Sequence, residues 1–290
     1  MVWLIGSKGM LASEIAAQLN QHNIQWIGSD REVDITDKVA VEAFVQQNFS
    51  SASLQWIINC AAYTAVDKAE DEPTIAQKLN ADALINICEV AKKYSAQLIH
   101  FSTDYVFDGT SAIPYIETDT TNPQSVYGST KLQGEKNILS LLPEHYIIRT
   151  AWLYGKNGNN FVATMLRLMN EKDSLKVVND QRGSPTYAVD LAKAVVHIVQ
   201  LDSRQYGIYH YSNEGNITWY DFACEIYKQG KDLGGIKSDC SVLPCTSNEF
   251  PQKAHRPSFS LLSKEKIKET FSLSIPQWNK SLTAYLKELL

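Results

Sequence analysis

Short apolar runs alternate with longer amphipathic segments along the first 150 residues. Each apolar run has the length of a buried strand, and each longer segment repeats its apolar side chains at the spacing of a helix face. This alternation predicts an α/β fold with a parallel, doubly wound sheet, because a parallel connection needs a crossover helix. The expected elements are Val2–Ile5, Met10–His22, Ile24–Gly28, Lys38–Asn48, Trp56–Cys60, Pro73–Tyr94, Gln97–Ser102, Tyr127–Leu141 and Tyr146–Thr150.

The pattern changes after Trp152, where the expected elements become shorter and less regular. They predict a smaller α/β lobe over residues 151–290, laid over the edge of a sheet built by residues 1–150, with chain crossings possible between the two. The stretch Gly230–Pro251 shows the least pattern, and we expect it to be irregular and mobile. Helices are expected at Phe161–Asn170, Val189–Val199, Trp219–Gln229 and Gln277–Leu290, and strands at Lys176–Val178 and Ile208–Tyr211.

Composition narrows the class of protein. The chain has 290 residues, of which 44% are hydrophobic and 20% charged, so it can bury a large core and is not disordered. Its formal charge of -5 gives no global field for nucleic acid or an anionic membrane, so an anionic ligand would need a local site. Five cysteines without a CxxC pair indicate a reducing compartment. With no signal-peptide pattern and no apolar run of about 20 residues, we expect a cytoplasmic protein without a membrane partner.

A glycine-containing turn follows the first expected strand, within Gly6-Ser7-Lys8-Gly9-Met10-Leu11-Ala12. Glycine permits the tight turn, and backbone N–H groups at a helix N-terminus can approach a pyrophosphate. Asp30 follows the second strand, about 20 residues further on, where a carboxylate can bind the hydroxyls of an adenine ribose. The pattern favours a Rossmann-type dinucleotide site over a plain glycine turn. Arg31 leaves open the choice between a ribose hydroxyl and a 2′-phosphate.

Hydroxyl-bearing residues lie at Ser102-Thr103 and in Tyr127-Gly128-Ser129-Thr130-Lys131. The spacing of four residues puts Tyr127 and Lys131 on one face of a helix, either as a solvated surface pair or as a catalytic pair. In a catalytic pair, the ammonium would lower the pKa of the phenol and fit it for proton transfer. Thr103, at the end of a parallel strand, can either donate a hydrogen bond to a carbonyl oxygen in the crevice or cap the following segment.

Gly6, Gly9 and Ala12, followed by Thr103 and then by the Tyr127/Lys131 pair, give the chain its resemblance to the extended short-chain dehydrogenase/reductase family. A closer resemblance, to the dTDP-4-dehydrorhamnose reductases, covers most of the first 190 residues and continues more loosely at His255-Arg256-Pro257. The segments that carry it are Ile58–Glu70, Ser102–Gly109, Val126–Glu135, Arg149–Tyr154 and Asn179–Thr186.

This resemblance implies an NAD(P)-binding Rossmann domain over residues 1–150 and a mainly substrate-binding lobe over residues 151–290. It implies reduction of the C4 ketone of dTDP-4-dehydro-β-L-rhamnose to dTDP-β-L-rhamnose with NADPH or NADH, in the synthesis of dTDP-rhamnose and cell-surface polysaccharide. The dTDP-sugar would be the partner, and the protein would be a monomer or a homodimer. Mg²⁺, which some relatives use at a dimer contact, is possible, but no carboxylate cluster in the sequence supports a metal site.

The resemblance also implies roles for individual residues. Tyr127 would protonate the C4 oxygen as hydride arrives, Lys131 would hold the nicotinamide ribose and tune Tyr127, and Thr103 would orient the ketone. Cofactor contacts are implied for Gly6, Gly9, Met10, Leu11, Asp30, Arg31, Asp34, Ile35, Ala62, Tyr63 and Thr64, besides Tyr127 and Lys131. Substrate contacts are implied for Asp104, Tyr105 and Trp152, to which Asn160, Gln181 and Arg182 could add.

Two other functions are compatible with the same fold. A nucleotide-sugar epimerase or dehydratase shares the Tyr/Lys pair, although Tyr105 stands after Asp104 where a dehydratase needs a second acidic residue. A non-catalytic regulatory subunit like the β subunit of methionine adenosyltransferase also resembles this family, but an intact Thr103/Tyr127/Lys131 set favours an enzyme. We interpret His100 and His197 as core histidines, and Cys60 as unreactive because no basic neighbour in the sequence argues for a thiolate.

Overall fold

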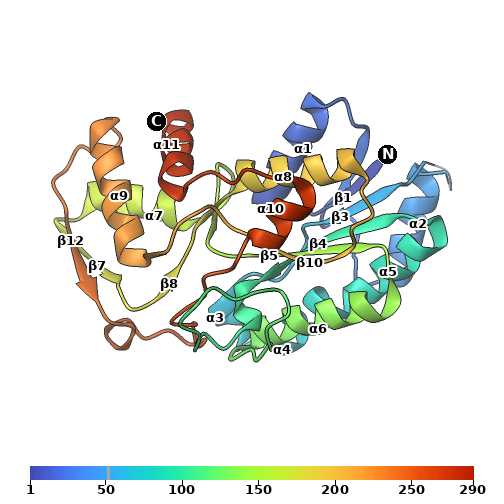
Figure 1. Ribbon diagram of the computed structural model, residues 1–290, viewed down its shortest axis with the longest axis horizontal. Coiled ribbons are helices and arrows are strands. Elements are labelled where there is room, and N and C mark those ends of the chain that lie inside the picture. The colour runs from blue at the N-terminus through green and yellow to red at the C-terminus, as the bar shows by residue number, and fades with distance from the viewer. Residues whose placement is uncertain (51–52) are drawn as a thin grey trace.

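The computed structural model describes residues 1–50 and 53–290 and is built around a six-stranded parallel sheet (Figure 1). The strand order is β10-β5-β4-β3-β1-β2. The chain places β2 on one side of β1 and β3 on the other, so the order reverses there and a crevice is expected at the carboxyl ends of β1 and β3. The predicted α/β class with a doubly wound parallel sheet is confirmed. The strands are Val2–Ile5 (β1), Trp26–Ser29 (β2), Trp56–Asn59 (β3), Gln97–Thr103 (β4), His145–Thr150 (β5) and Gly207–Tyr211 (β10).

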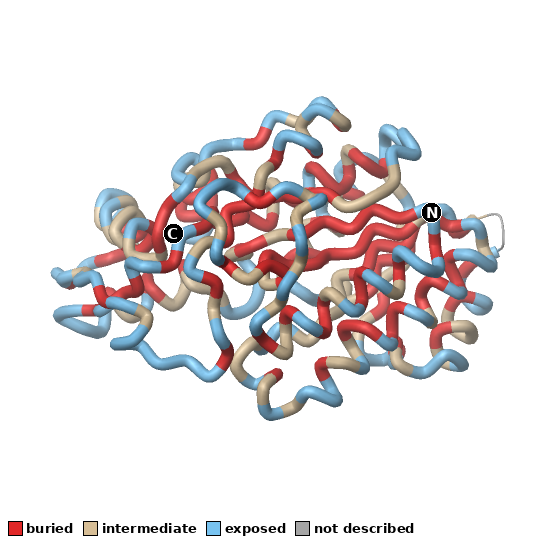
Figure 2. Tube along the Cα trace, turned by 60° about the horizontal axis from the view of Figure 1, so that its bottom comes forward, coloured by how far each residue is buried: buried red, intermediate tan, exposed pale blue. Residues whose placement is uncertain are grey.

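Helices cover both faces of the sheet, which is why its strands are apolar on both sides. In β1, Val2 and Leu4 join the core on one face, whereas Trp3 and Ile5 join the core on the other. Figure 2 shows the strands as nearly continuous buried segments beneath more exposed helices. The first face is covered by α1 (Met10–Gln21), α8 (Ala188–Leu201) and α10 (Glu265–Phe271), and the second by α2 (Lys38–Asn48), α5 (Ala83–Tyr94) and α6 (Val126–Leu141).

The link between β3 and β4 contains the predicted amphipathic run Pro73–Tyr94. The link begins with α3 (Val66–Ala69) and α4 (Pro73–Gln77). It then passes through a π-helical turn, Lys78–Asp82, into α5. A π-turn inserts one extra residue into a helix and re-aims its side chains. The turn contains buried Asn80, which reaches two elements of the candidate site.

The second half of the chain forms its own apolar core and also returns to the sheet. The third core joins α7 (Phe161–Glu171), α9 (Trp219–Asp232) and α11 (Trp278–Leu289), which lie together beyond the sheet in Figure 1. By contrast, α8 packs against α1, and β10 extends the sheet next to β5. Within residues 1–50 and 53–290, no helix has the length and apolar character needed to cross a membrane. The short strands are β6 (Leu153–Tyr154), β7 (Ser174–Val178), β8 (Arg182–Gly183), β9 (Thr186–Tyr187), β11 (Ile217–Thr218) and β12 (Ser241–Cys245).

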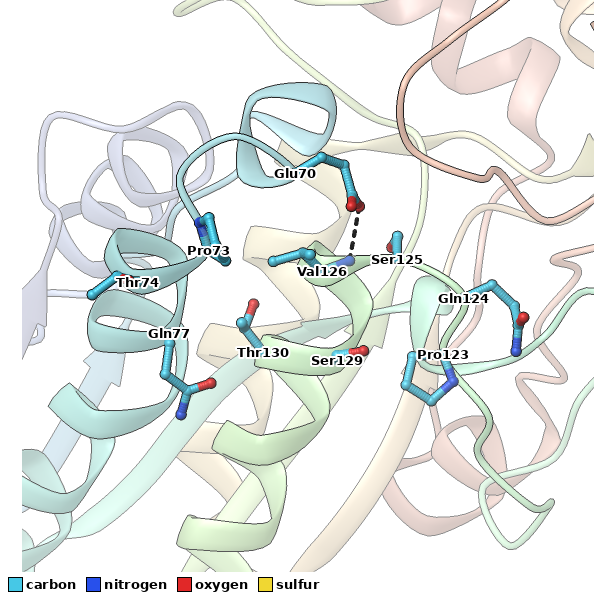
Figure 3. Close-up of a pocket in the computed structure, with 10 residues that line it drawn as sticks. All are labelled: Glu70, Pro73, Thr74, Gln77, Pro123, Gln124, Ser125, Val126, Ser129 and Thr130. Carbon is cyan, nitrogen blue, oxygen red and sulfur yellow. Dashed lines mark hydrogen bonds between the residues drawn. The ribbon is translucent and has the colours of Figure 1, made fainter.

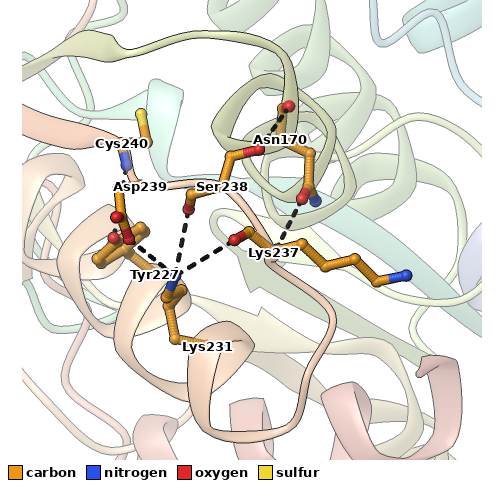
Figure 4. A network of polar contacts seen from close by, with 7 residues as sticks. All are labelled: Asn170, Tyr227, Lys231, Lys237, Ser238, Asp239 and Cys240. Carbon is orange, nitrogen blue, oxygen red and sulfur yellow. Dashed lines mark hydrogen bonds and ion pairs between the residues drawn. The ribbon is translucent and has the colours of Figure 1, made fainter.

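The expectation that Gly230–Pro251 is irregular is wrong for part of this stretch. It contains β12, which pairs in parallel with β7 along five residue pairs. The turn before β12 is fixed by Lys231, whose Nζ lies 2.9 Å from a carboxylate oxygen of Asp239, and by Asn170, which accepts a hydrogen bond from the backbone N–H of Lys237 (Figure 4). This stretch therefore contributes a regular strand beside β7.

Candidate active site

The turn after β1 forms a cradle made of backbone. Gly6 has a φ of +73°, and a Cβ at this position would lie 3.0 Å from the backbone nitrogen of Ala61. Gly9 is the N-cap of α1 and makes no side-chain capping bond. The N–H groups of the first turn of α1 are therefore free to bind an anion at the positive end of the helix dipole. This geometry fits the pyrophosphate of a dinucleotide.

Side chains in this turn are used for packing. Leu11 and Ala12 are buried in the core between α1 and the sheet, so Leu11 can offer a ligand its backbone N–H but not its side chain. Ala12 is fully buried, and its small side chain allows α1 to lie close to the sheet. Met10 is half-buried and faces Gly155, which directly follows β6. Met10 therefore lies where the two halves of the chain meet.

The residues predicted to bind the adenosine end have different environments. Asp30 follows β2 and is half-buried, and Arg31 is exposed. Asp34 accepts hydrogen bonds from the backbone and hydroxyl of Thr36, which lower its pKa. Ile35 is buried in the second core. The structure thus leaves Asp30 and Arg31 open to a ligand at the end of β2, whereas Ile35 is part of the core.

The loop after β3 is held by a residue that the sequence analysis did not select. Asn80 donates to the carbonyl of Tyr63 and accepts from its backbone N–H, and it also donates to the Thr130 hydroxyl on α6. Tyr63 donates its hydroxyl proton to Glu72. The predicted cofactor residues Ala62 and Tyr63 are half-buried, and Thr64 is exposed. Asn80 therefore ties this loop to the helix that carries Tyr127 and Lys131.

Thr103, Tyr105 and Tyr127 form the centre of the site at the end of β4. The Thr103 hydroxyl donates to Asp104 and accepts from the backbone N–H of Tyr105, so it caps the 3-10 turn Asp104–Val106. The rings of Tyr105 and Tyr127 meet edge to face at 5.5 Å. This close approach of α6 to Tyr105 requires glycine at position 128, because a Cβ there would lie 2.2 Å from the carbonyl oxygen of Tyr105. The capping alternative for Thr103 is thus realised next to the phenol of Tyr127.

The expected lowering of the Tyr127 pKa by Lys131 is not found. Burial raises the pKa of Tyr127 above its usual range, and a hydrogen bond with the Thr103 side chain only partly opposes the rise. The Lys131 amine instead contacts β4, with Nζ 2.6 Å from the carbonyl oxygen of Phe101 and 3.1 Å from Nε2 of His100. Burial lowers the pKa of Lys131 to about 8. In this arrangement Tyr127 is a well-protonated phenol.

Cys60 has a basic neighbour after all. The charge of Lys131 acts to lower the pKa of the Cys60 thiol, but burial dominates and raises this pKa well above its ordinary value. The expectation of an unreactive thiol therefore holds for a different reason, namely desolvation rather than the lack of a nearby cation.

Asp104 is the buried carboxylate of the site. It is 2% exposed, and its Oδ2 has no hydrogen-bond partner within the described ranges. Burial raises the pKa of Asp104 to about 6, although polar contacts with Ser260 and Thr103 oppose the rise. A buried, partly satisfied acid beside a hydroxyl is typical of a ligand-binding site rather than of a core.

Arg256 is a second residue that the spacing analysis did not select, although it lies in the loosely matching His255-Arg256-Pro257. Its guanidinium donates from Nη1 to the Tyr105 hydroxyl at 3.2 Å and from Nη2 to Asp67 at 2.9 Å. Its Nε is buried without a partner in the part of the chain that the structure describes. Arg256 thus joins the C-terminal segment to α3, with a charged donor beside Tyr105.

Trp152 lies just after β5 and contacts residues from the second half of the chain. Its backbone φ is +50°, which is unusual for a residue other than glycine. Its ring stacks on that of Trp219, with the ring centroids 3.6 Å apart. Gly183 lies against the same ring. The three residues expected to add substrate contacts bind protein groups: Asn160 caps α7, Gln181 donates to Ser247, and Arg182 donates to Asn216.

An open pocket of about 720 Å³ lies beside this cluster, between α4 and the start of α6 (Figure 3). Glu70 reaches across it to accept a hydrogen bond from the backbone N–H of Val126. Neither Tyr127 nor Lys131 lines it, so we place the candidate site at the cluster itself. Across residues 1–50 and 53–290, no group of three His, Cys, Asp or Glu side chains is arranged to hold a metal ion.

Fold and site together define a class of protein, the extended short-chain dehydrogenases/reductases, with a Rossmann sheet, an uncapped glycine turn, and Thr103, Tyr127 and Lys131 around the end of β4. Comparison with known proteins narrows the class. The chain belongs to the RmlD substrate binding domain family, whose model matches residues 1–290.

Similarity to proteins of known name confirms the resemblance found in the sequence. A dTDP-4-dehydrorhamnose reductase from Salmonella typhimurium is 42% identical over 236 residues, covering 80% of this chain and 79% of that protein. The crystal structure of a dTDP-4-dehydrorhamnose reductase from Clostridium acetobutylicum is 43% identical with a TM-score of 0.91, covering 99% of both chains. The Bacillus anthracis enzyme, in complex with NADP, is 35% identical with a TM-score of 0.92, covering 99% of this chain and 98% of that chain.

Proposed function

We propose that the chain reduces the C4 ketone of dTDP-4-dehydro-β-L-rhamnose to give dTDP-β-L-rhamnose, with NADPH or NADH. The observation that carries the proposal is the cluster of Thr103, Tyr127 and Lys131 at the end of β4, on the same edge of the sheet as the cradle at Gly6 and Gly9. The 42% identity to the Salmonella typhimurium reductase supports this substrate.

The protein groups supply the proton and orient the ketone. The reduced nicotinamide supplies a hydride to the carbonyl carbon. As negative charge develops on the carbonyl oxygen, Tyr127 gives it a proton, and the carbonyl becomes an alcohol. The raised pKa of Tyr127 keeps its phenol protonated at neutral pH, so the proton is in place before the reaction. Thr103 can turn its hydroxyl proton from Asp104 toward the same oxygen.

The two ligands divide between the two parts of the chain in this proposal. Residues 1–150 hold the dinucleotide through the glycine cradle, through Asp30 and Arg31, and through Lys131 at the ribose. Residues 151–290 mainly hold the sugar nucleotide, with Trp152 at the boundary and with Asp104 and Tyr105 reaching in from the first part. The protein acts as a monomer or homodimer in the cytoplasm, which fits the five free cysteines of the described chain.

The test is a direct assay with dTDP-4-dehydrorhamnose and each reduced dinucleotide. We expect loss of the dinucleotide absorbance in a 1:1 ratio with formation of dTDP-rhamnose. Purified protein that carries a bound nicotinamide, consumes no added dinucleotide and interconverts sugar epimers would be an epimerase. Protein that converts neither the ketone nor the dinucleotide would support the regulatory alternative.

A further inference from the structure

Three buried polar side chains form a hydrogen-bonded row behind the candidate site. They are Asn59 at the end of β3, His100 on β4 and Lys131 on α6, and each is 1% exposed. Asn59 Nδ2 lies 3.1 Å from His100 Nδ1, and His100 Nε2 lies 3.1 Å from Lys131 Nζ. Both ring nitrogens of His100 are therefore in use, and each has a nitrogen partner. The row has a definite proton arrangement only if each contact pairs one donor with one acceptor.

The backbone fixes the first contact. Asn59 Oδ1 accepts a hydrogen bond from the backbone N–H of Ala61 at 3.0 Å, and a backbone N–H can only donate. The amide NH₂ of Asn59 must therefore face His100 and donate to Nδ1. A neutral imidazole carries one proton, so this proton is on Nε2, the nitrogen that faces Lys131.

The second contact then determines the form of Lys131. An ammonium has only donors, so it cannot accept from the Nε2–H of His100. A neutral amine can accept that proton on its lone pair and still donate to the carbonyl oxygen of Phe101, which lies 2.6 Å away. All contacts of Asn59, His100 and Lys131 are satisfied together only when Lys131 is neutral.

The surrounding charges agree with this arrangement. On α6, Tyr127 lies one turn before Lys131 and Glu135 one turn after it. Glu135 raises the pKa of Lys131, but its carboxylate is paired at both oxygens with Arg149 of β5. Cys60, after β3, is held as a thiol by burial. Burial lowers the pKa of His100 well below its usual value and that of Lys131 to about 8, so His100 is neutral and neutral Lys131 is accessible near physiological pH.

We infer that His100 is a positioning residue that stabilises Lys131 as a neutral amine in the free protein, and that Lys131 takes up a proton when the dinucleotide binds. The second half of this statement rests on the proposed function, because the hydroxyl and phosphate oxygens of a dinucleotide are acceptors that favour the ammonium. Binding of the cofactor would then create the cation that the reaction uses.

The first test needs no cofactor. In protein labelled with ¹⁵N-histidine, NMR of the free chain at pH 9 should show the His100 ring with a protonated Nε2 and a bare Nδ1. The His100→Gln variant identifies the signal by its loss. A ring protonated at Nδ1, or at both nitrogens, overturns the inference whether or not the protein is a reductase.

The second test measures proton uptake. Calorimetric titration with NADP⁺ at pH 9, in two buffers of different ionisation enthalpy, should show uptake of about one proton per site, because a group with a pKa of about 8 is mostly neutral there. In His100→Gln, an amide oxygen can accept from the ammonium, so Lys131 is charged before binding and uptake should fall several-fold. A merely structural role for His100 would not change this number.

A matched control is His197→Gln, which replaces a histidine on α8 bonded to the carbonyl oxygen of Phe271, outside the site. It should bind NADP⁺ with the uptake of the unmodified protein. Equal uptake by His100→Gln and the unmodified protein overturns the inference. If the unmodified protein does not bind NADP⁺, the proposed function is contradicted, and so is proton uptake by Lys131 on cofactor binding. The NMR test of the His100 tautomer still decides whether His100 stabilises Lys131 as a neutral amine.

Discussion

Two regions on the same edge of the sheet are built in opposite ways. The turn after β1 presents backbone: Gly6 and Gly9 leave the first N–H groups of α1 uncovered, and the neighbouring apolar side chains are in the core. The end of β4 presents buried polar side chains, among them Asp104 and Lys131. The first region depends on space and backbone angles, and the second depends on the free energy of burying polar groups.

The two regions should be sensitive to different kinds of substitution. At the glycine turn an added methyl group matters, because it strains the positive φ of Gly6 and crowds the backbone of Ala61, which displaces the N–H groups that would hold a phosphate. At the end of β4 a change of one atom matters, because burial has shifted the pKa of Asp104 upward and that of Lys131 downward. Variants in the two regions should therefore fail in different measurements.

The largest effect is expected for Tyr127→Phe. Removal of the phenol proton should lower kcat about 10³-fold, within the range for general acid catalysis, and leave the Kd for NADPH within about threefold. Tyr154→Phe is the matched control, because Tyr154 is buried in the third core and its hydroxyl has no partner within the described ranges. Turnover of Tyr127→Phe within tenfold of the unmodified enzyme would show that another group donates the proton.

Asp104→Asn should stabilise the fold while it slows the reaction. The pKa of Asp104 is about 6 in the folded chain against 3.8 ordinarily, so the folded state binds this proton more tightly. The ionised carboxylate therefore opposes folding above pH 6, and this penalty disappears as the pH falls below 4. Urea unfolding at pH 8 should show the variant up to about 3 kcal/mol more stable, at 1.36 kcal/mol per pKa unit, and the gain should vanish near pH 4.

Asp108→Asn is the matched control, because the pKa of Asp108 is shifted in the opposite direction from that of Asp104. Hydrogen bonds from Thr110, Tyr115 and Asn122 lower the pKa of Asp108 to about 2. Its carboxylate supports folding above pH 4, and this support is lost as the pH falls toward 2. The Asp108 variant should thus be less stable than the unmodified protein at pH 8. A similar pH dependence in both variants would contradict the burial argument for Asp104.

Gly6→Ala tests the backbone region. A positive φ strains any residue with a Cβ by roughly 1–2 kcal/mol, and here the methyl group would also crowd Ala61. Gly234→Ala is the matched control, since Gly234 has a φ of +76° and no atom within 4 Å of the added Cβ. Both variants should lose stability, and Gly6→Ala should lose more because of the contact with Ala61, but only Gly6→Ala should raise the Kd for the dinucleotide, by about tenfold. Equal binding by both would mean that the turn does not carry the phosphate.

The first half of the fold could be predicted because most of its strands are central in the sheet and apolar on both faces. Val2–Ile5 is expected and found as β1. β12 was missed because most of its side chains are exposed and it contains Pro244, so it carries no strand pattern. α10 was missed because it is short and is fixed by Ile267 and Phe271 in the core of the sheet, which is a tertiary contact.

In the site, too, features that depend on neighbouring residues could be predicted, whereas contacts between residues far apart in the sequence could not. The glycine turn and the Tyr127/Lys131 pair are local spacings, so the sequence reveals them. His100 is 31 positions from Lys131, and Arg256 is 189 positions from Asp67, so their contacts exist only in the folded chain. The ionic form of each buried group likewise follows from the surroundings that folding creates, which is why the pKa of Tyr127 was predicted with the wrong sign.

The smallest effect is expected for Arg31→Ala, which tests an exposed positive charge at the end of β2, beside the cradle. Arg31 is exposed, so its contact with a 2′-phosphate would be screened and the Kd for NADPH should rise only about threefold to fivefold, with the Kd for NADH unchanged. Arg167→Ala, an exposed arginine on α7 that pairs with Glu171, should change neither value. Equal weakening of both dinucleotides would place Arg31 at the pyrophosphate that they share. A rise of more than a hundredfold in the Kd for NADPH would show that the backbone cradle is not the main source of dinucleotide binding at this edge of the sheet.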